Sequence, residues 1–192
     1  MKIVFLLSVF LLTGISEGFS QKIKQLSVAA TTEAIGLPFT NYFPIHPGLE
    51  VKATLRQVEK SKSIRSFNVG AGFFHHRRLE TAIYLGGEYQ HSFKLLHEKV
   101  SLDLPIGLGY LHSFYPSPLY EQNEDGNFDT VFQLGRPHAY LNLGIGVSCL
   151  GSGKVQPFIR QEMLLEAPFA NGIPLITHSM LKAGIHLKIS KS

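Results

Sequence analysis

The sequence predicts an all-β fold, namely an eight-stranded antiparallel up-and-down transmembrane β-barrel that follows an N-terminal signal peptide. Three observations predict this fold class. Apolar residues alternate with small or polar residues along most of the chain after residue 20, which is the periodicity of a strand with one apolar face. Most alternating segments reach or exceed the roughly nine to eleven residues that a tilted strand needs to cross a bilayer. Connections at one predicted end are short and most of those at the other are long, as is typical of membrane-spanning barrels.

Residues 1–20 have the pattern of a cleaved secretory signal peptide. A short positive start and the apolar residues 3–12 come before Gly18 and Ser20, the small residues at positions −3 and −1 of a cleavage site. An apolar stretch of about ten residues is too short to cross about 30 Å of hydrocarbon as a helix. We therefore expect export and cleavage, which leave a single β-barrel domain over residues 21–192.

The eight predicted strands cover, in chain order, residues 23–34, 48–59, 64–75, 79–92, 98–114, 136–150, 154–166 and 177–190. The first and the seventh are the least regular. In the second strand, apolar residues occupy the odd positions from Leu49 to Leu55, and polar residues occupy the even ones. The third strand continues in the same way from Phe67 to Phe73, with Asn and Gly between the apolar residues.

The middle strands follow the same rule. The fourth places Glu88 in the polar row and Tyr89 in the apolar row. In the fifth strand, residues 100–110 are apolar or aromatic at even positions, against Ser, Asp, Pro and Gly at odd positions. In the sixth, residues 139–149 are apolar at odd positions. Cys149, the only cysteine, belongs to this apolar row and is interpreted as a small hydrophobic residue.

The last two strands complete the pattern. The seventh contributes Arg160 and Glu162 to the polar row, and the eighth alternates over residues 181–189 with Lys182 in the polar row. The connections after strands one, five and seven are long, at residues 35–47, 115–135 and 167–176. Those after strands two, four and six are short, at residues 60–63, 93–97 and 151–153. The connection after strand three, near residues 75–78, is a short exception.

The polar row is predicted to face the inside of the barrel. It is rich in Gly, which would make a poor outer surface for a soluble protein but suits the crowded interior of a narrow eight-stranded barrel. Its charged members form a predicted lumen charge network: Lys52, Arg56, Glu88, Asp103, Arg160, Glu162 and Lys182. Isolated charges there would be costly, so we expect ion pairs. The pairs would form a plug that closes the barrel or, alternatively, line a narrow polar path or small-ligand site.

The chain resembles the small outer-membrane β-barrel proteins of Gram-negative bacteria over residues 23–190, through the signal peptide, the eight amphipathic strands and the Gly-rich inward row. The resemblance implies an integral outer-membrane protein with a structural or surface-interaction role and no catalysis. It departs from the pattern at the end of the chain, where Lys188 to Ser192 replace a terminal aromatic residue. The alternative is a secreted soluble barrel of the lipocalin type that binds a small apolar ligand.

The resemblance also implies an enzymatic alternative, because outer-membrane lipid A deacylases use Ser, His and a carboxylate. The chain has three adjacent His-Ser pairs, at residues 91–92, 112–113 and 178–179. Neighbours on a strand point to opposite faces, so none of these pairs can act together, and only a site across strands remains for an acyl hydrolase. We therefore expect no catalytic residue.

No metal or other cofactor is expected. The adjacent His75 and His76 are interpreted as exposed turn residues beside Arg77 and Arg78. Residues 121–129 alternate oxygen-bearing side chains around a Gly, but they lack the full calcium-loop pattern and its final Glu, so they are interpreted as a solvated turn.

The expected partners are outer-membrane lipids and an extracellular partner that contacts the long loop 115–135. The net charge of +4 is spread thinly along the 192 residues, with no basic cluster larger than Arg77-Arg78. Nucleic-acid binding is therefore not expected. The protein is expected to be a monomer.

Overall fold

The computed structural model describes residues 23–39, 42–116, 119–123, 126–131, 134–169 and 172–189. The predicted signal peptide and its cleavage site lie outside these residues. Within the described ranges there are ten strands. No helix there is long and apolar enough to cross a membrane.

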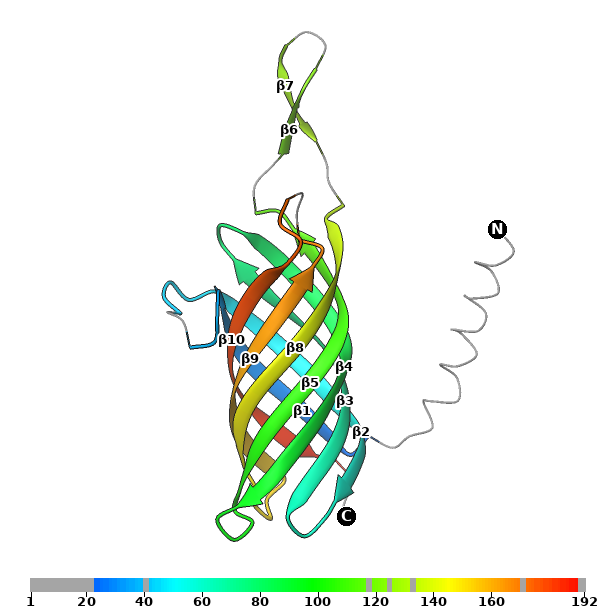
Figure 1. Ribbon diagram of the computed structural model, residues 1–192, viewed down its shortest axis with the longest axis vertical. Coiled ribbons are helices and arrows are strands. Elements are labelled where there is room, and N and C mark those ends of the chain that lie inside the picture. The colour runs from blue at the N-terminus through cyan, green and yellow to red at the C-terminus, as the bar shows by residue number, and fades with distance from the viewer. Residues whose placement is uncertain are drawn as a thin grey trace, which may run out of the picture.

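Eight strands form a closed antiparallel barrel, as predicted (Figure 1). Their bounds are β1 Gln25–Ile35, β2 Pro47–Glu59, β3 Ser63–His76, β4 Glu80–Leu95, β5 Val100–Phe114, β8 Arg136–Cys149, β9 Val155–Ala167 and β10 Ile176–Lys188. Each strand pairs with its neighbour in the chain, and β1 pairs with β10 to close the wall. Closure leaves no strand edge unpaired.

The long connection between β5 and β8 contains structure that its sequence did not predict. Strands β6 (Leu119–Gln122) and β7 (Phe128–Val131) form a separate two-stranded hairpin within the predicted loop 115–135. Figure 1 shows this hairpin projecting beyond one end of the barrel, whereas the short β2–β3, β4–β5 and β8–β9 turns lie at the opposite end. The two ends of the barrel therefore differ as predicted.

The outer wall carries the predicted apolar row. Ile83, Ile106, Leu108 and Ile159 are each about half exposed or more, and Leu108 reaches 69%. A row of this kind is the lipid-facing surface of a membrane barrel. Two polar residues on the outer wall, Gln161 and Ser179, interrupt this apolar row. Tyr42 covers both of them: its hydroxyl lies 2.5 Å from Gln161 Oε1 and 2.8 Å from Ser179 Oγ.

A β-bulge in β2 corrects the predicted face of Arg56. Thr54 pairs with Asn68 on β3, but Arg56 pairs with the next residue, Phe67. One extra residue, Leu55, therefore lies in β2, and the alternation of faces reverses beyond it. Arg56 is exposed, on the same side of the wall as the exposed Phe67, so it does not belong to the lumen charge network.

Glycines make room for the larger side chains of the lumen. A Cβ atom at Gly144 would lie 2.6 Å from Glu162 Cγ and 2.8 Å from the backbone oxygen of Gln161. One at Gly70 would lie 2.5 Å from Lys52 Cγ. The Gly-rich inward row is therefore a consequence of the narrow interior, as predicted.

A thin apolar layer crosses the lumen. Its buried members are Phe74, Ala82, Tyr84, Leu111, Leu164 and Met180. Along β4, the inward residues run from Glu80 through Tyr84 to Glu88, so this layer separates two levels of ionisable side chains. Those two levels are the candidate sites.

Candidate functional site

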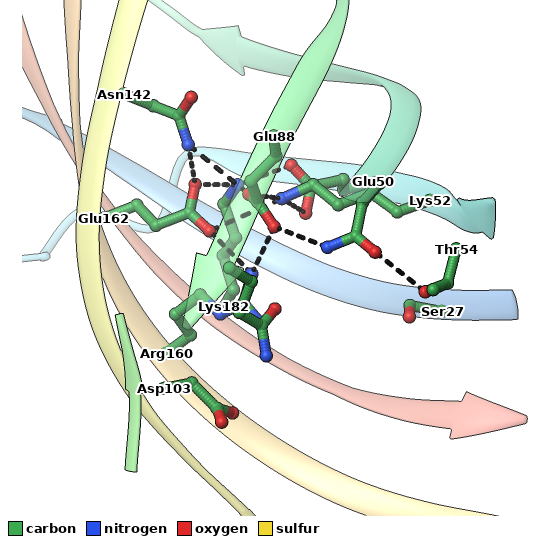
Figure 2. Close-up of polar contacts among 12 residues, drawn as sticks. Ser27, Glu50, Lys52, Thr54, Glu88, Asp103, Asn142, Arg160, Glu162 and Lys182 are labelled. Atoms are coloured by element: carbon green, nitrogen blue, oxygen red, sulfur yellow. Dashed lines mark hydrogen bonds and ion pairs between the residues drawn. The ribbon is translucent and has the colours of Figure 1, made fainter. Parts of the chain in front are cut away.

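The first level is a balanced set of three cations and three carboxylates, the central ion cluster. It consists of Glu50, Lys52, Glu88, Arg160, Glu162 and Lys182. Figure 2 shows these side chains converging from several strands of the wall. Equal numbers of opposite charges inside a narrow lumen satisfy the requirement that buried charges be paired.

Each cation in the central ion cluster contacts two or more carboxylates. Lys52 Nζ lies 2.6 Å from Glu88 and 2.9 Å from Glu50. Lys182 Nζ lies 2.5 Å from Glu50 and 2.7 Å from Glu162. Arg160 Nη1 lies 3.3 Å from Glu88 and 3.2 Å from Glu162. These contacts cross the lumen, so the cluster fills its cross-section.

Neutral side chains extend the network along the wall. Asn142 Nδ2 donates to Glu162 at 3.2 Å, and Thr54 donates to Asn68, which donates in turn to Glu88 (Figure 2). These hydrogen bonds occupy further carboxylate lone pairs. Among the buried side-chain atoms of the cluster, Arg160 Nε lacks a hydrogen-bond partner. The remaining contacts link the strands of the wall through the interior.

The structure brings together five of the seven residues predicted for the lumen charge network: Lys52, Glu88, Arg160, Glu162 and Lys182. Asp103 is also buried in the lumen, but its hydrogen bonds go to Ser101 and Ser148. Glu50 was not predicted as a member. Its place in the same inward row as Lys52, two residues away, was the signal that could have identified it.

The second level lies beyond the apolar layer, at the end from which the β6–β7 hairpin projects. We call it the mouth cluster, and its buried ionisable members are Glu33, His76, Glu80, His138, Glu166 and His178, with the partly exposed His46 beside them. The prediction for His76 was wrong. Its ring is buried and lies 3.8 Å from the ring of His46, centroid to centroid, rather than exposed in a turn.

His178 is at the centre of the mouth cluster. Its Nδ1 lies 2.9 Å from Glu33 Oε1, and its Nε2 lies 3.1 Å from Glu166 Oε2 and 3.7 Å from Glu80 Oε1. The ligand-type atoms of Glu80, Glu166 and His178 all lie within 4.8 Å of one another. No sequence spacing indicates this group, because its members come from strands β4, β9 and β10.

A serine, a histidine and a carboxylate also meet in the mouth cluster. Ser113 Oγ lies 2.8 Å from His138 Nε2, and His138 Nδ1 lies 3.0 Å from Glu166 Oε1. This is the arrangement across strands that the adjacent His-Ser pairs could not form. All three side chains are buried inside the barrel.

The structure resembles solved outer-membrane barrels. It superposes on Neisserial surface protein A with a TM-score of 0.50 and 11% sequence identity, over 86% of this chain and 95% of that one. The chain has the fold of an eight-stranded outer-membrane barrel. Ail, the attachment invasion locus protein of Yersinia pestis, gives a TM-score of 0.48 at 13% identity over 86% and 100% of the two chains.

The outer membrane enzyme PagL gives a TM-score of 0.48 at 8% identity, over 86% of this chain and 99% of that one. At such identities the superpositions describe the fold and nothing more, and the fold statement rests on the match to Neisserial surface protein A. No protein-family model matches the chain. A comparison with curated proteins gives no match either.

Proposed function

We propose that the protein is an integral outer-membrane barrel that serves as a closed anchor and presents its β6–β7 hairpin to an extracellular partner. The observation that carries this proposal is that the interior of the barrel is filled, whereas one of its ends bears a projecting hairpin. The lumen is occupied at the level of the central ion cluster, while one connection extends far beyond the wall (Figure 1). The role is therefore structural or concerned with surface interaction rather than transport.

The filled lumen supports a closed barrel. The central ion cluster places cations and carboxylates in direct contact across the interior, and the apolar layer with Phe74 and Met180 lies next to it. An ion that crossed would have to break these pairs and then pass an apolar constriction, which itself opposes water and ions. Eight strands enclose little space beyond that of their own side chains.

The outer wall supports a lipid environment. Its exposed aliphatic row, with Leu108 at 69% and Leu85 at 56% exposure, would be an unusually apolar surface in water. The same features disfavour the soluble lipocalin-like alternative. A barrel of that kind needs an apolar cavity for its ligand, whereas this interior is mainly charged and hydrogen-bonded.

The projecting hairpin supports the surface-interaction role. Tyr120 and Phe128 on its two strands are 59% and 68% exposed. Aromatic side chains that project from a polar loop are typical anchors of protein–protein contacts. Asn123 and Gly126 close the hairpin through a backbone hydrogen bond of 3.0 Å, so the aromatics stand on an ordered element.

We further propose that the barrel has no hydrolase activity. Ser113, His138 and Glu166 are all buried inside the barrel, so an acyl chain in the membrane would have no direct access to the hydroxyl.

The test is the topology of the protein in intact cells. An epitope inserted after Gly126 in the hairpin is compared with the same epitope inserted after Ser152 in the β8–β9 turn. Antibody added to intact cells should label the first and not the second, and both should be labelled after the outer membrane is permeabilised. Labelling of the Ser152 insertion alone, or recovery of the protein in a soluble fraction, would contradict the proposal.

A further inference from the structure

We propose that the mouth cluster is a binding site for one divalent transition-metal ion of the zinc class, with His178 Nε2, Glu80 and Glu166 as its ligands. These three side chains reach the same point in the lumen from β10, β4 and β9. The proposal concerns a level of the barrel that plays no part in the proposed anchoring function. The metal-site proposal and the anchoring proposal can therefore fail independently of each other.

The distances fit a tetrahedral ion. His178 Nε2 lies 3.1 Å from Glu166 Oε2 and 3.7 Å from Glu80 Oε1. Zinc bonds of about 2.0–2.2 Å in a tetrahedron place two ligand atoms roughly 3.3–3.6 Å apart. The two His178 distances lie within a few tenths of an ångström of that range, and the ligand-type atoms of all three residues lie within 4.8 Å of one another.

The remaining nitrogen of His178 is oriented as in known metal sites. A metal-bound histidine typically donates its other ring N–H to a carboxylate, which holds the ring and raises its basicity. His178 Nδ1 lies 2.9 Å from Glu33 Oε1, and both side chains are fully buried. Glu33 is thus a positioning residue.

The charge of the mouth cluster also favours a bound cation. Among the described residues, every ion pair of Glu33, Glu80 and Glu166 is with a histidine. The central ion cluster, by contrast, balances its three carboxylates with two Lys and one Arg. Three buried carboxylates without a permanent cation are costly, and a divalent ion would offset most of that charge.

An unpartnered oxygen atom provides a second, independent observation. Glu80 Oε1 is buried and has no hydrogen-bond partner among the described residues, and the Glu80 side chain is only 4% exposed. Buried carboxylate oxygens are normally satisfied. Glu80 Oε1 points toward His178 Nε2, which is where the ion would bind.

The neighbouring group of Glu33, His46 and His76 is a weaker candidate for the ion. Its ligand-type atoms also lie within 4.8 Å of one another. However, His76 Nδ1 accepts hydrogen bonds from the backbone N–H groups of Arg78 and Leu79, at 3.3 and 3.0 Å. Because Nδ1 of this ring accepts these hydrogen bonds, a neutral His76 carries its proton on Nε2. Neither ring nitrogen then has a free lone pair for a metal ion.

The donor set selects the class of ion. A neutral imidazole nitrogen with two carboxylates suits zinc and related transition metals, whereas calcium and magnesium prefer sites made only of oxygen. The probe is therefore Zn²⁺, with Mg²⁺ in large excess as the competitor. The protein is purified from membranes in detergent, stripped with a chelator and titrated with Zn²⁺ against a chromophoric chelator.

The wild type should bind one equivalent of Zn²⁺ that excess Mg²⁺ does not displace. Glu80→Gln and His178→Gln should each weaken binding by at least roughly tenfold, and Glu33→Gln by roughly 10–100-fold, as expected for a group that positions a ligand. Glu50→Gln is the matched control, because it removes a buried carboxylate from the central ion cluster and should leave Zn²⁺ affinity unchanged.

Folding of each variant is checked by its heat-modifiable mobility on a detergent gel, and thermal unfolding with and without Zn²⁺ gives a second measurement. Binding should raise the unfolding temperature of the wild type and of Glu50→Gln. Folded wild-type protein that binds no stoichiometric Zn²⁺ would overturn the proposal whatever the variants do. Equal affinity in the wild type and in Glu80→Gln would overturn it as well.

Discussion

The Nζ atom of Lys52 lies 2.6 Å from a carboxylate oxygen of Glu88, although the whole of β3 lies between their strands. The same is true of Lys182 and Glu50, which meet at 2.5 Å across β1. Contacts that skip a strand are possible only where the lumen is narrow enough for side chains to cross it. They make the interior of this barrel a continuous ionic structure.

Lys52→Met should destabilise the barrel. It leaves Glu50 and Glu88 with fewer cations in a buried setting, and removing one partner of a buried pair costs about 3–5 kcal/mol. Denaturant unfolding in detergent, followed by heat-modifiable mobility, measures this. Arg56→Ala is the matched control, because the bulge places that cation outside the lumen; it should change the free energy of unfolding by less than about 0.5 kcal/mol. Equal stabilities of the two variants would contradict the role of the central ion cluster.

Gly144→Val should also destabilise the barrel, by about 1–3 kcal/mol, because the new side chain meets Glu162 and the backbone of β9 in a filled interior. Gly151→Val, in the short turn after β8, has no atom closer than 3.8 Å to its new Cβ. We expect little change there in the same unfolding assay. Equal effects of the two substitutions would show that the lumen around Gly144 has room for a larger side chain.

The protein should not form a stable pore. Purified wild-type protein in planar bilayers should give no sustained conductance steps, because the central ion cluster and the apolar layer together occupy the lumen. A lipid-matched bilayer containing a known porin is the control for channel detection. Reproducible steps that disappear in Lys52→Met or change their ion selectivity would show instead that the cluster lines a path.

Tyr42→Phe should loosen the cover over the polar part of the outer wall. The substitution removes the hydrogen bond that the hydroxyl donates to Gln161 Oε1, an oxygen that stays buried, and the contact with Ser179 Oγ, which still accepts a hydrogen bond from Gln161 Nε2 at 2.9 Å. We expect a loss of about 1–3 kcal/mol in stability, the cost of unsatisfied buried polar groups. Tyr120→Phe on the exposed hairpin is the control and should leave stability unchanged.

Period-two alternation predicted the eight barrel strands, and the Gly-rich polar row predicted which face lines the lumen. It failed at Arg56, because a bulge adds one residue and no local pattern marks it. It also missed the mouth cluster, since Glu33, Glu80 and His178 belong to strands far apart in the sequence and become neighbours only through barrel closure. Most of the central ion cluster was predictable, because its members share one inward row.

The β6–β7 hairpin was not predicted for a different reason. Its strands have four residues each and no apolar face to bury, so they lack the alternation that identified the others. Turn residues such as Asn123 and Gly126 indicated only a solvated turn. Short strands of this kind are defined by their mutual hydrogen bonds rather than by a hydrophobic pattern.

The most direct test of the account is the depth of single tryptophans in a bilayer. The chain has no native Trp, so Leu108→Trp on the outer wall and Phe128→Trp on the hairpin each give one fluorophore. In liposomes with lipids brominated at mid-chain, Leu108→Trp should emit in the blue and be strongly quenched, while Phe128→Trp should emit in the red and be unaffected. Absence of quenching at residue 108 in folded protein would contradict a lipid-facing apolar wall.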